Sequence, residues 1–151
     1  MRLTLGFALC ATLPARACWD DAATRYQVNS TLLQAIARTE SGLNPQAIGR
    51  NRNGSRDIGL MQINSGWLPA LAAYGIAEQD LFEPCTNIHV GAWILAGNVY
   101  RFGNTWEAVG AYNTAKPALR RAYIDKVRRH LPADTAASAP RPRAVITTSA
   151  R

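Results

Sequence analysis

The chain has 151 residues, of which 48% are hydrophobic, and a formal net charge of +7. This length gives room for one domain with its own core, and we expect no second domain. The basic residues that gather between positions 116 and 129 could attract a nucleic acid, but no nucleic-acid-binding motif accompanies them. We therefore expect a solvated face or attraction to an anionic surface, and no nucleic-acid partner.

The N-terminal segment has the three parts of a secretory signal peptide. A basic start at Met1 and Arg2 is followed by a mostly apolar run over residues 3–13, and then by the small-residue pattern Ala-Arg-Ala at 15–17. The apolar run is too short to span a membrane. We predict a signal peptide over residues 1–17, cleavage after Ala17 and export to the periplasm. An uncleaved anchor is the alternative.

Cleavage there changes the cysteine count. Cys10 leaves with the signal peptide, and the mature chain keeps Cys18 and Cys85. An even pair in an oxidising compartment predicts a disulfide bond between them. Lipidation of Cys18 at the new N-terminus is the alternative, although Arg16 is unexpected inside a lipid-attachment site and Cys85 would then be unpaired.

The remaining patterns predict a mainly α-helical domain over residues 18–131. Apolar periodicity and capping residues indicate helices over 19–26, 30–41, 59–64, 66–74, 84–102, 106–112 and 117–131. Turn-forming residues fill positions 49–57, and Asn53-Gly54 favours a small β-hairpin near residues 47–58. From position 132 the composition shifts to Ala, Thr, Ser, Pro and Arg, which predicts a disordered tail over residues 132–151.

Glu40 stands at the end of an apolar helical pattern. Leu33, Ile36 and Glu40 follow the spacing i, i+3 and i+7, so they share one helix face, and that face should be buried. Burial disfavours the charged form of a carboxyl group and raises its pKa toward the range in which a general acid works. The alternative is a structural Glu that reaches solvent or pairs with Arg38, Arg50 or Arg52.

Asp57 is the candidate for a second carboxylate. It follows Glu40 across the hairpin-like loop, and two carboxyl groups can flank a glycosidic bond, one as acid and one as nucleophile or base. The alternative is a turn Asp that bonds the nearby backbone. Spacing alone does not decide between these interpretations.

Three short motifs resemble the lytic transglycosylase SLT domain. They are ESGLNP at 40–45, GLMQIN at 59–64 and AYN at 111–113, and the stretch GSRDIGLMQINSGW also resembles c-type lysozyme. The resemblance covers residues 18–131. Within this family the chain is most similar to the small, single-domain, secreted proteins of the IagB/IpgF type, which accompany secretion or conjugation machines.

The resemblance implies an α-helical, lysozyme-like fold with a glycan bound in a cleft. It implies that Glu40 is the catalytic acid and base, and that Tyr112 orients Glu40. It also implies a set of glycan-binding residues: Ser41, Met61, Gln62, Asn64, Tyr112, Asn113 and Tyr123. The sequence departs from the family at Thr114-Ala115, where a small residue and then Gly are usual, so the resemblance does not fix the turn after Tyr112.

The implied reaction cleaves the β-1,4 bond between N-acetylmuramic acid and N-acetylglucosamine in peptidoglycan. Glu40 would protonate the leaving oxygen and then accept a proton from the muramoyl 6-hydroxyl, which closes a 1,6-anhydro ring. This chemistry needs no cofactor, and no spacing of His, Cys and Asp indicates a metal site. A monomer of this type would open the cell wall locally for a secretion, pilus or conjugation apparatus.

Two other functions stay open at this stage. If Asp57 faces Glu40 across the cleft, lysozyme-like hydrolysis with Asp57 as nucleophile would leave a reducing end instead of an anhydro ring. A protein with the same fold and no turnover would be a peptidoglycan-binding assembly protein. The aromatic residues Trp67, Trp106 and Tyr123 either pack in the core or stack on sugars, whereas Met61 is interpreted first as a packing residue, although the resemblance places it in the glycan-binding set.

Overall fold

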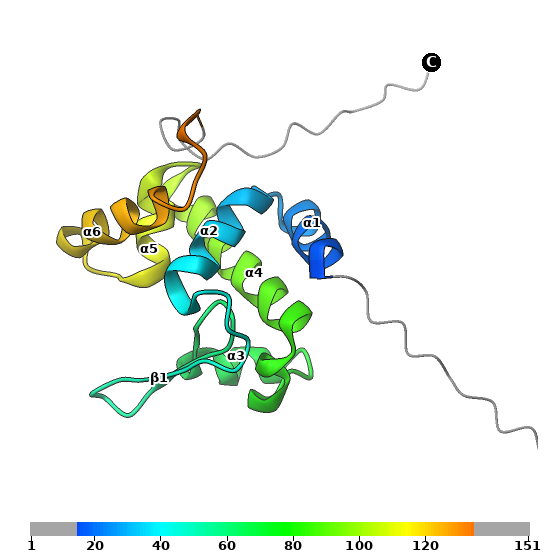
Figure 1. Cartoon of the computed structure of the whole chain (residues 1–151). Helices are drawn as coiled ribbons and strands as arrows, with labels where there is room; N and C mark the ends of the chain where they lie inside the picture. Colours follow the sequence, from blue (N-terminus) through cyan, green and yellow to red (C-terminus); the bar gives the residue numbers. More distant parts are fainter. Residues whose placement is uncertain (1–14, 135–151) are drawn as a thin grey trace, which may run out of the picture.

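The computed structural model describes residues 15–134, which form a mainly helical domain with one small antiparallel sheet (Figure 1). The α-helices are α1 (Ala15–Tyr26), α2 (Ser30–Ser41), α3 (Leu68–Ala72), α4 (Pro84–Phe102), α5 (Trp106–Asn113) and α6 (Pro117–Arg128). Two 3₁₀ helices, η1 (Ser65–Trp67) and η2 (Glu78–Phe82), join them. The predicted fold class is confirmed, although α6 ends at Arg128 instead of residue 131 and η2 was not predicted.

Helix α2 carries Glu40 in its last turn, and both of its ends are fixed by local chemistry. The side chain of Asn29 accepts a hydrogen bond from the backbone N–H of Leu32 at 2.9 Å, which satisfies one free donor of the first turn. Gly42 ends the helix with φ 63°, a left-handed conformation that costs glycine little. Leu33 and Ile36 are fully buried, so the face that leads to Glu40 packs into the core as predicted.

The sheet has three short antiparallel strands in the order β1-β2-β3: β1 (Ile48–Arg50), β2 (Arg56–Ile58) and β3 (Ile63–Asn64). The predicted hairpin joins β1 and β2 and pairs Gly49 with Asp57. Its loop closes with Gly54 at φ 83°, where a side chain would be strained. Pairing of β2 with β3 places Asp57 beside Asn64.

The helix predicted over residues 59–64 is wrong. This segment makes turns and then enters strand β3. Gly59 has φ 74°, which lies outside the range of a regular α-helix, and a Cβ there would collide with the carbonyl oxygen of Leu81 and the side-chain amide of Asn87. The buried Asn87 side chain binds the segment instead, because it accepts from the N–H of Met61 at 2.7 Å and donates to the carbonyl of Ile58 at 2.9 Å.

Helix α4 runs through the middle of the domain and packs against α1, α5 and η2 (Figure 1). Glu83 caps it by accepting from the N–H groups of Cys85 and Thr86, and Gly103 follows its last residue as predicted. Its inward residues are buried: Asn87, Ile88, Val90, Gly91, Ala92, Leu95 and Asn98. None of the helices within residues 15–134 combines the length and the apolar character that a membrane crossing requires.

A disulfide bond joins Cys18 in α1 to Cys85 in α4, which confirms the predicted pairing. Next to it, the imidazole of His89 is half-buried, with Nε2 at 3.1 Å from a carboxylate oxygen of Asp21. Most of the predicted signal peptide lies outside the described residues, and the predicted cleavage point after Ala17 falls in the first turn of α1. The predicted tail from residue 135 onward also lies outside them.

Candidate active site

Glu40 is half-buried at the end of α2, where α6 passes over it. The hydroxyl of Tyr123, on α6, donates a hydrogen bond to Oε1 of Glu40 at 2.5 Å. Within the described part of the chain Glu40 forms no ion pair, so the expected alternative of a partner at Arg38, Arg50 or Arg52 is wrong. Glu40 is therefore held by a neutral donor.

The surroundings of Glu40 raise its pKa from 4.5 to about 7. Burial has the largest effect, because removal from water disfavours the carboxylate. The hydrogen bond from Tyr123 lowers the pKa, the negative charge of Asp57 raises it, and the positive charge of Lys126 lowers it by a smaller amount. A carboxyl group with this pKa can both donate and accept a proton near neutral pH, which a combined acid and base requires.

Glu40 opens into a pocket of about 300 Å³ between α2, the sheet and α5. The pocket adjoins a second hollow of about 870 Å³ that runs along α4. The two share Asn64, Trp67, Ile94, Tyr112 and Asn113. Together they form a groove with a carboxyl group at one end and aromatic and amide side chains along it, which is suited to a glycan strand.

Asp57 lines the same pocket as Glu40, from strand β2. Its Oδ1 accepts from the side-chain amide of Asn64 at 2.7 Å, and its Oδ2 accepts from that of Asn51 at 2.9 Å. Asp57 is thus a strand residue in the pocket whose carboxylate is bonded to side-chain amides, and not the turn residue bonded to backbone that was the alternative. Asn51 was not predicted as a site residue, and only its place in the polar loop hinted at it.

Two predicted glycan-binding residues support the pocket from behind. The hydroxyl of Ser41 donates to the carbonyl of Leu60 at 2.7 Å, which ties the end of α2 to the segment before β3. Met61 is fully buried, and its side chain packs against Gly91 of α4, where a Cβ would come within 2.7 Å of the methionine methyl group. Packing is therefore the interpretation of Met61 that the structure favours.

Gln62, Asn64 and Asn113 line the pocket, as the motifs imply. Gln62 has φ 51°, and its side-chain nitrogen donates to the carbonyl of Gly59 at 2.8 Å. Asn113 is exposed where the two hollows meet. Ile63, which is buried, and Ile94, which is partly buried, also line the pocket, but apolar residues carry no signal in sequence that distinguishes a pocket wall from core.

Tyr123, and not Tyr112, donates the hydrogen bond to Glu40, which differs from the expectation. Tyr112 was expected to orient Glu40, but its hydroxyl donates to the carbonyl of Met61 at 3.0 Å, and the contact with Glu40 belongs to Tyr123. Burial raises the pKa of both hydroxyls well above the usual value, so both are donors at neutral pH. The cause is spatial: α6 brings Tyr123 over Glu40, whereas Tyr112 points to the segment before β3.

Trp67 and Trp93 form an edge-on pair along the groove, with ring centroids 5.3 Å apart. Trp67 is 39% exposed, so part of its ring is available for stacking on a sugar. Trp106 packs against the core instead, with the guanidinium of Arg128 4.4 Å from its ring centroid. Among residues 15–134 no group of three His, Cys, Asp or Glu side chains is arranged to hold a metal ion.

The helices, the small sheet and the groove between them define a lysozyme-like domain, and comparison with known proteins identifies which one. The family model of the transglycosylase SLT domain matches residues 17–129, and the chain belongs to this family. Invasion protein IagB of Salmonella typhimurium is 44% identical over 115 residues, which cover 73% of this chain and 72% of IagB. Protein IpgF of Shigella flexneri is 42% identical over 120 residues, which cover 76% of this chain and 79% of IpgF.

A solved structure of an inactive mutant of lytic transglycosylase Slt from Pseudomonas aeruginosa shares the fold. It is 26% identical and aligns with a TM-score of 0.57 over 89% of this chain. The aligned part is 23% of that enzyme, so this chain spans less than a quarter of its length. The likeness therefore concerns one domain of a much larger protein.

Proposed function

We propose that this chain is a peptidoglycan lytic transglycosylase, which cleaves the β-1,4 bond between N-acetylmuramic acid and N-acetylglucosamine and leaves a 1,6-anhydromuramoyl end. Its membership of the SLT family and its likeness to a solved lytic transglycosylase support this activity. The observation that carries the proposal is Glu40, a half-buried carboxyl group with a pKa of about 7 at the wall of a groove. The reaction requires no metal or cofactor.

The proposed reaction uses Glu40 twice. The carboxyl group first gives its proton to the glycosidic oxygen, and the bond between that oxygen and C1 of the muramoyl sugar breaks. The carboxylate then takes the proton of the C6 hydroxyl while that oxygen bonds to C1, so the ring closes and Glu40 is protonated again. The substrate's own acetamido group stabilises the intermediate, as in substrate-assisted glycosidases.

The other site residues would hold the glycan and Glu40 in place. Gln62, Asn64 and Asn113 line the pocket with side-chain amides. Those of Gln62 and Asn113 would bind the hydroxyl and acetamido groups of the sugars, whereas the amide of Asn64 is bonded to Ser55, Asp57 and the N–H of Gly66. Tyr112 would contact the glycan with its ring. We assign Ser41 and Met61 an indirect part in glycan binding, through the segment before β3 that they fix.

The same pocket keeps hydrolysis as a second candidate. Asp57 lines it opposite the end of α2, and a carboxylate there could act as the nucleophile of a lysozyme-like reaction. We favour Glu40 acting without a nucleophilic partner, because the motif AYN at 111–113 belongs to the SLT pattern and the model of that family matches residues 17–129. In this role Asp57 raises the proton affinity of Glu40 through its charge.

Mass spectrometry of muropeptides tests the proposal. Purified sacculi are digested with the mature protein, with Glu40→Gln and with Asp57→Asn. We expect anhydromuramoyl products from the wild type, loss of at least about 100-fold in rate for Glu40→Gln, and retention of most activity in Asp57→Asn.

Two other outcomes would select the alternatives. Reducing-end products that disappear in Asp57→Asn would establish hydrolysis by two carboxylates. Binding to sacculi without soluble product from any variant, under conditions in which a known lysozyme releases fragments, would establish a non-catalytic peptidoglycan-binding protein.

We further propose that the enzyme acts in the periplasm, as a monomer, and opens the wall locally for a secretion, pilus or conjugation apparatus. The 44% sequence identity to Invasion protein IagB and the disulfide bond support this setting. In the source bacterium, chromosomal Glu40→Gln should reduce assembly of the apparatus without a change in protein level. Normal assembly of the apparatus in that strain would show that the activity of this enzyme is not needed for it.

A further inference from the structure

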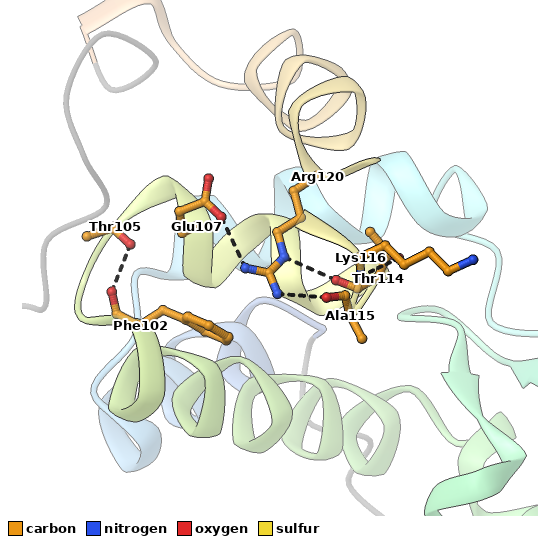
Figure 2. A network of polar contacts seen from close by, with 7 residues as sticks. All are labelled: Phe102, Thr105, Glu107, Thr114, Ala115, Lys116 and Arg120. Carbon is orange, nitrogen blue, oxygen red and sulfur yellow. Dashed lines mark hydrogen bonds and ion pairs between the residues drawn. The ribbon is translucent and has the colours of Figure 1, made fainter. Parts of the chain in front are cut away.

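A buried arginine links the last two helices of the domain. Arg120, in α6, is only 6% exposed, and its guanidinium is shown at the centre of a polar network in Figure 2. Its Nη1 lies 3.1 Å from a carboxylate oxygen of Glu107, its Nε donates to the carbonyl of Thr114 at 3.3 Å, and its Nη2 donates to the carbonyl of Ala115 at 3.1 Å. The guanidinium carbon is 4.6 Å from the ring centroid of Phe102.

The backbone of α5 is shaped to receive this side chain. A Cβ on Gly110 would lie 2.5 Å from the Cβ of Arg120 and 3.0 Å from its Cγ, so only glycine allows the stem to lie against α5. A buried charge is costly unless its donors are satisfied, and here a carboxylate and two carbonyls satisfy them. The arrangement is specific to the forked guanidinium, because a lysine ammonium cannot reach both carbonyls and the carboxylate in one plane.

The two carbonyls belong to the turn that directly follows Tyr112 and Asn113. On the other side of the arginine, Tyr123 stands at position i+3 of α6, close to the same face. Arg120 therefore belongs to the helix that carries Tyr123 and binds the turn that follows Tyr112, and it does not line the Glu40 pocket.

We propose that Arg120 is a positioning residue: it locks the turn after Tyr112 to α6, and so holds the Tyr123 hydroxyl against Glu40. The catalytic consequence rests on the proposed function, whereas the positioning of Tyr123 does not.

A double-mutant cycle tests the positioning without any need for turnover. The Glu40 carboxyl is titrated by ¹³C NMR in the wild type, Tyr123→Phe, Arg120→Lys and the double variant. Asp57 on β2 and Lys126 on α6 also act on Glu40 electrostatically, and the charge of Glu40 raises the pKa of Tyr112 on α5; all three residues are unchanged in every variant. Removal of the Tyr123 hydrogen bond takes away a group that favours the carboxylate, so we expect Tyr123→Phe to raise the Glu40 pKa by about 1.

Arg120→Lys should raise the Glu40 pKa in the same direction, and Tyr123→Phe should then add little. Independent, additive effects of the two substitutions would overturn the proposal, because a merely structural Arg120 would leave the Tyr123 contact intact. Arg120→Gln, which is neutral and leaves no unpaired buried cation, serves in the same cycle if Arg120→Lys does not fold. Thermal unfolding confirms which variants are folded.

Kinetics on sacculi give the second measurement. We expect kcat of Arg120→Lys to fall about tenfold while KM changes by less than about twofold, because Glu40 loses its orientation and the groove keeps its lining. Arg121→Lys is the matched control. Arg121 is the next residue along α6, its side chain is 79% exposed, and within the described residues it pairs only with Asp125. A wild type without product would reject the proposed function, and the NMR cycle would still decide the role of Arg120.

Discussion

At the scale of single residues, Glu40 shows how a fold creates a proton donor from an ordinary carboxyl group. Burial at the end of α2 and the charge of Asp57 raise its pKa, and the Tyr123 hydroxyl and Lys126 lower it. Burial outweighs the other effects, and the pKa reaches about 7. The folded chain therefore keeps a proton on Glu40 at pH values at which an unfolded chain has lost it.

This difference predicts how stability depends on pH. Below pH 4.5 Glu40 is protonated in both the folded and the unfolded chain, and above about 7 it is ionised in both. Between these values the folded state binds more protons than the unfolded state. The free energy of unfolding therefore falls as the pH rises from 4.5 to about 7, because the ionised Glu40 must then be buried in the folded state. Glu40→Gln has no charge to bury, so at about pH 8 it should be more stable than the wild type by ~3 kcal/mol.

Urea unfolding at about pH 4 and pH 8 measures this effect, and the lower pH is the internal control because the wild type is then protonated as well. The two proteins should have nearly equal free energies of unfolding at the lower pH. A Glu40→Gln variant that is less stable than the wild type at the higher pH would contradict the burial of a carboxylate at this position.

At the scale of elements, one amide on α4 fixes the segment that joins β2 to β3. Asn87 is fully buried, accepts from the N–H of Met61, and donates to the carbonyls of Ile58 at 2.9 Å and Leu81 at 2.7 Å. Met61 in turn offers its carbonyl to Tyr112. The chain of contacts from α4 through this segment to α5 sets the floor of the pocket.

Asn87→Ala should therefore destabilise the protein by ~3 kcal/mol, because three backbone groups would lose their partner in a dry interior. Activity should also fall in the folded fraction, since Tyr112 and Gln62 lose their support. Gly97→Ala, on the exposed side of the same helix with no atom within 4 Å of its Cβ, is the control and should gain about 0.5–1 kcal/mol. Equal free energies of unfolding for wild type and Asn87→Ala would show that water replaces the amide.

The sequence predicted those elements whose ends are set by neighbouring residues. Asn29 and Gly42 delimit α2, Pro84 and Gly103 delimit α4, and each acts within one turn of its helix. The segment 59–64 could not be assigned in this way, because Asn87 determines its path from another helix. Apolar spacing alone indicated a helix there.

The site was predictable to a similar extent. Glu40 could be identified from its place on an apolar helix face, and Gln62, Asn64 and Tyr112 came from motifs that resemble a known family. The contact between Tyr123 and Glu40 joins residues 83 positions apart, and no local pattern reports it. The burial of Arg120 could not be predicted either. Its charge suggested a solvated face, whereas its burial depends on the turn at Thr114 and Ala115, whose carbonyls bind the guanidinium.

At the scale of the whole molecule, α1 and α4 are joined by packing and by the Cys18–Cys85 disulfide, which has a sequence separation of 67. Neither cysteine lines the Glu40 pocket. The disulfide therefore contributes to the stability of the domain and not to its chemistry. A cross-link over a loop of this length restricts the unfolded chain, which the chain-entropy account values at roughly 4 kcal/mol.

Replacement of both cysteines, Cys18→Ala with Cys85→Ala, should lower the free energy of unfolding by ~4 kcal/mol and leave kcat unchanged at a temperature at which the variant is folded. Urea unfolding of the wild type with and without a thiol reductant is the matched control, because reduction should cause most of the same loss. A labelling reagent for free thiols should not modify the folded mature protein before reduction. Labelling of both cysteines would contradict the bond. If the stability of the domain depends on the Cys18–Cys85 disulfide, the protein folds correctly only in an oxidising compartment, which is the setting proposed for an enzyme of the cell wall.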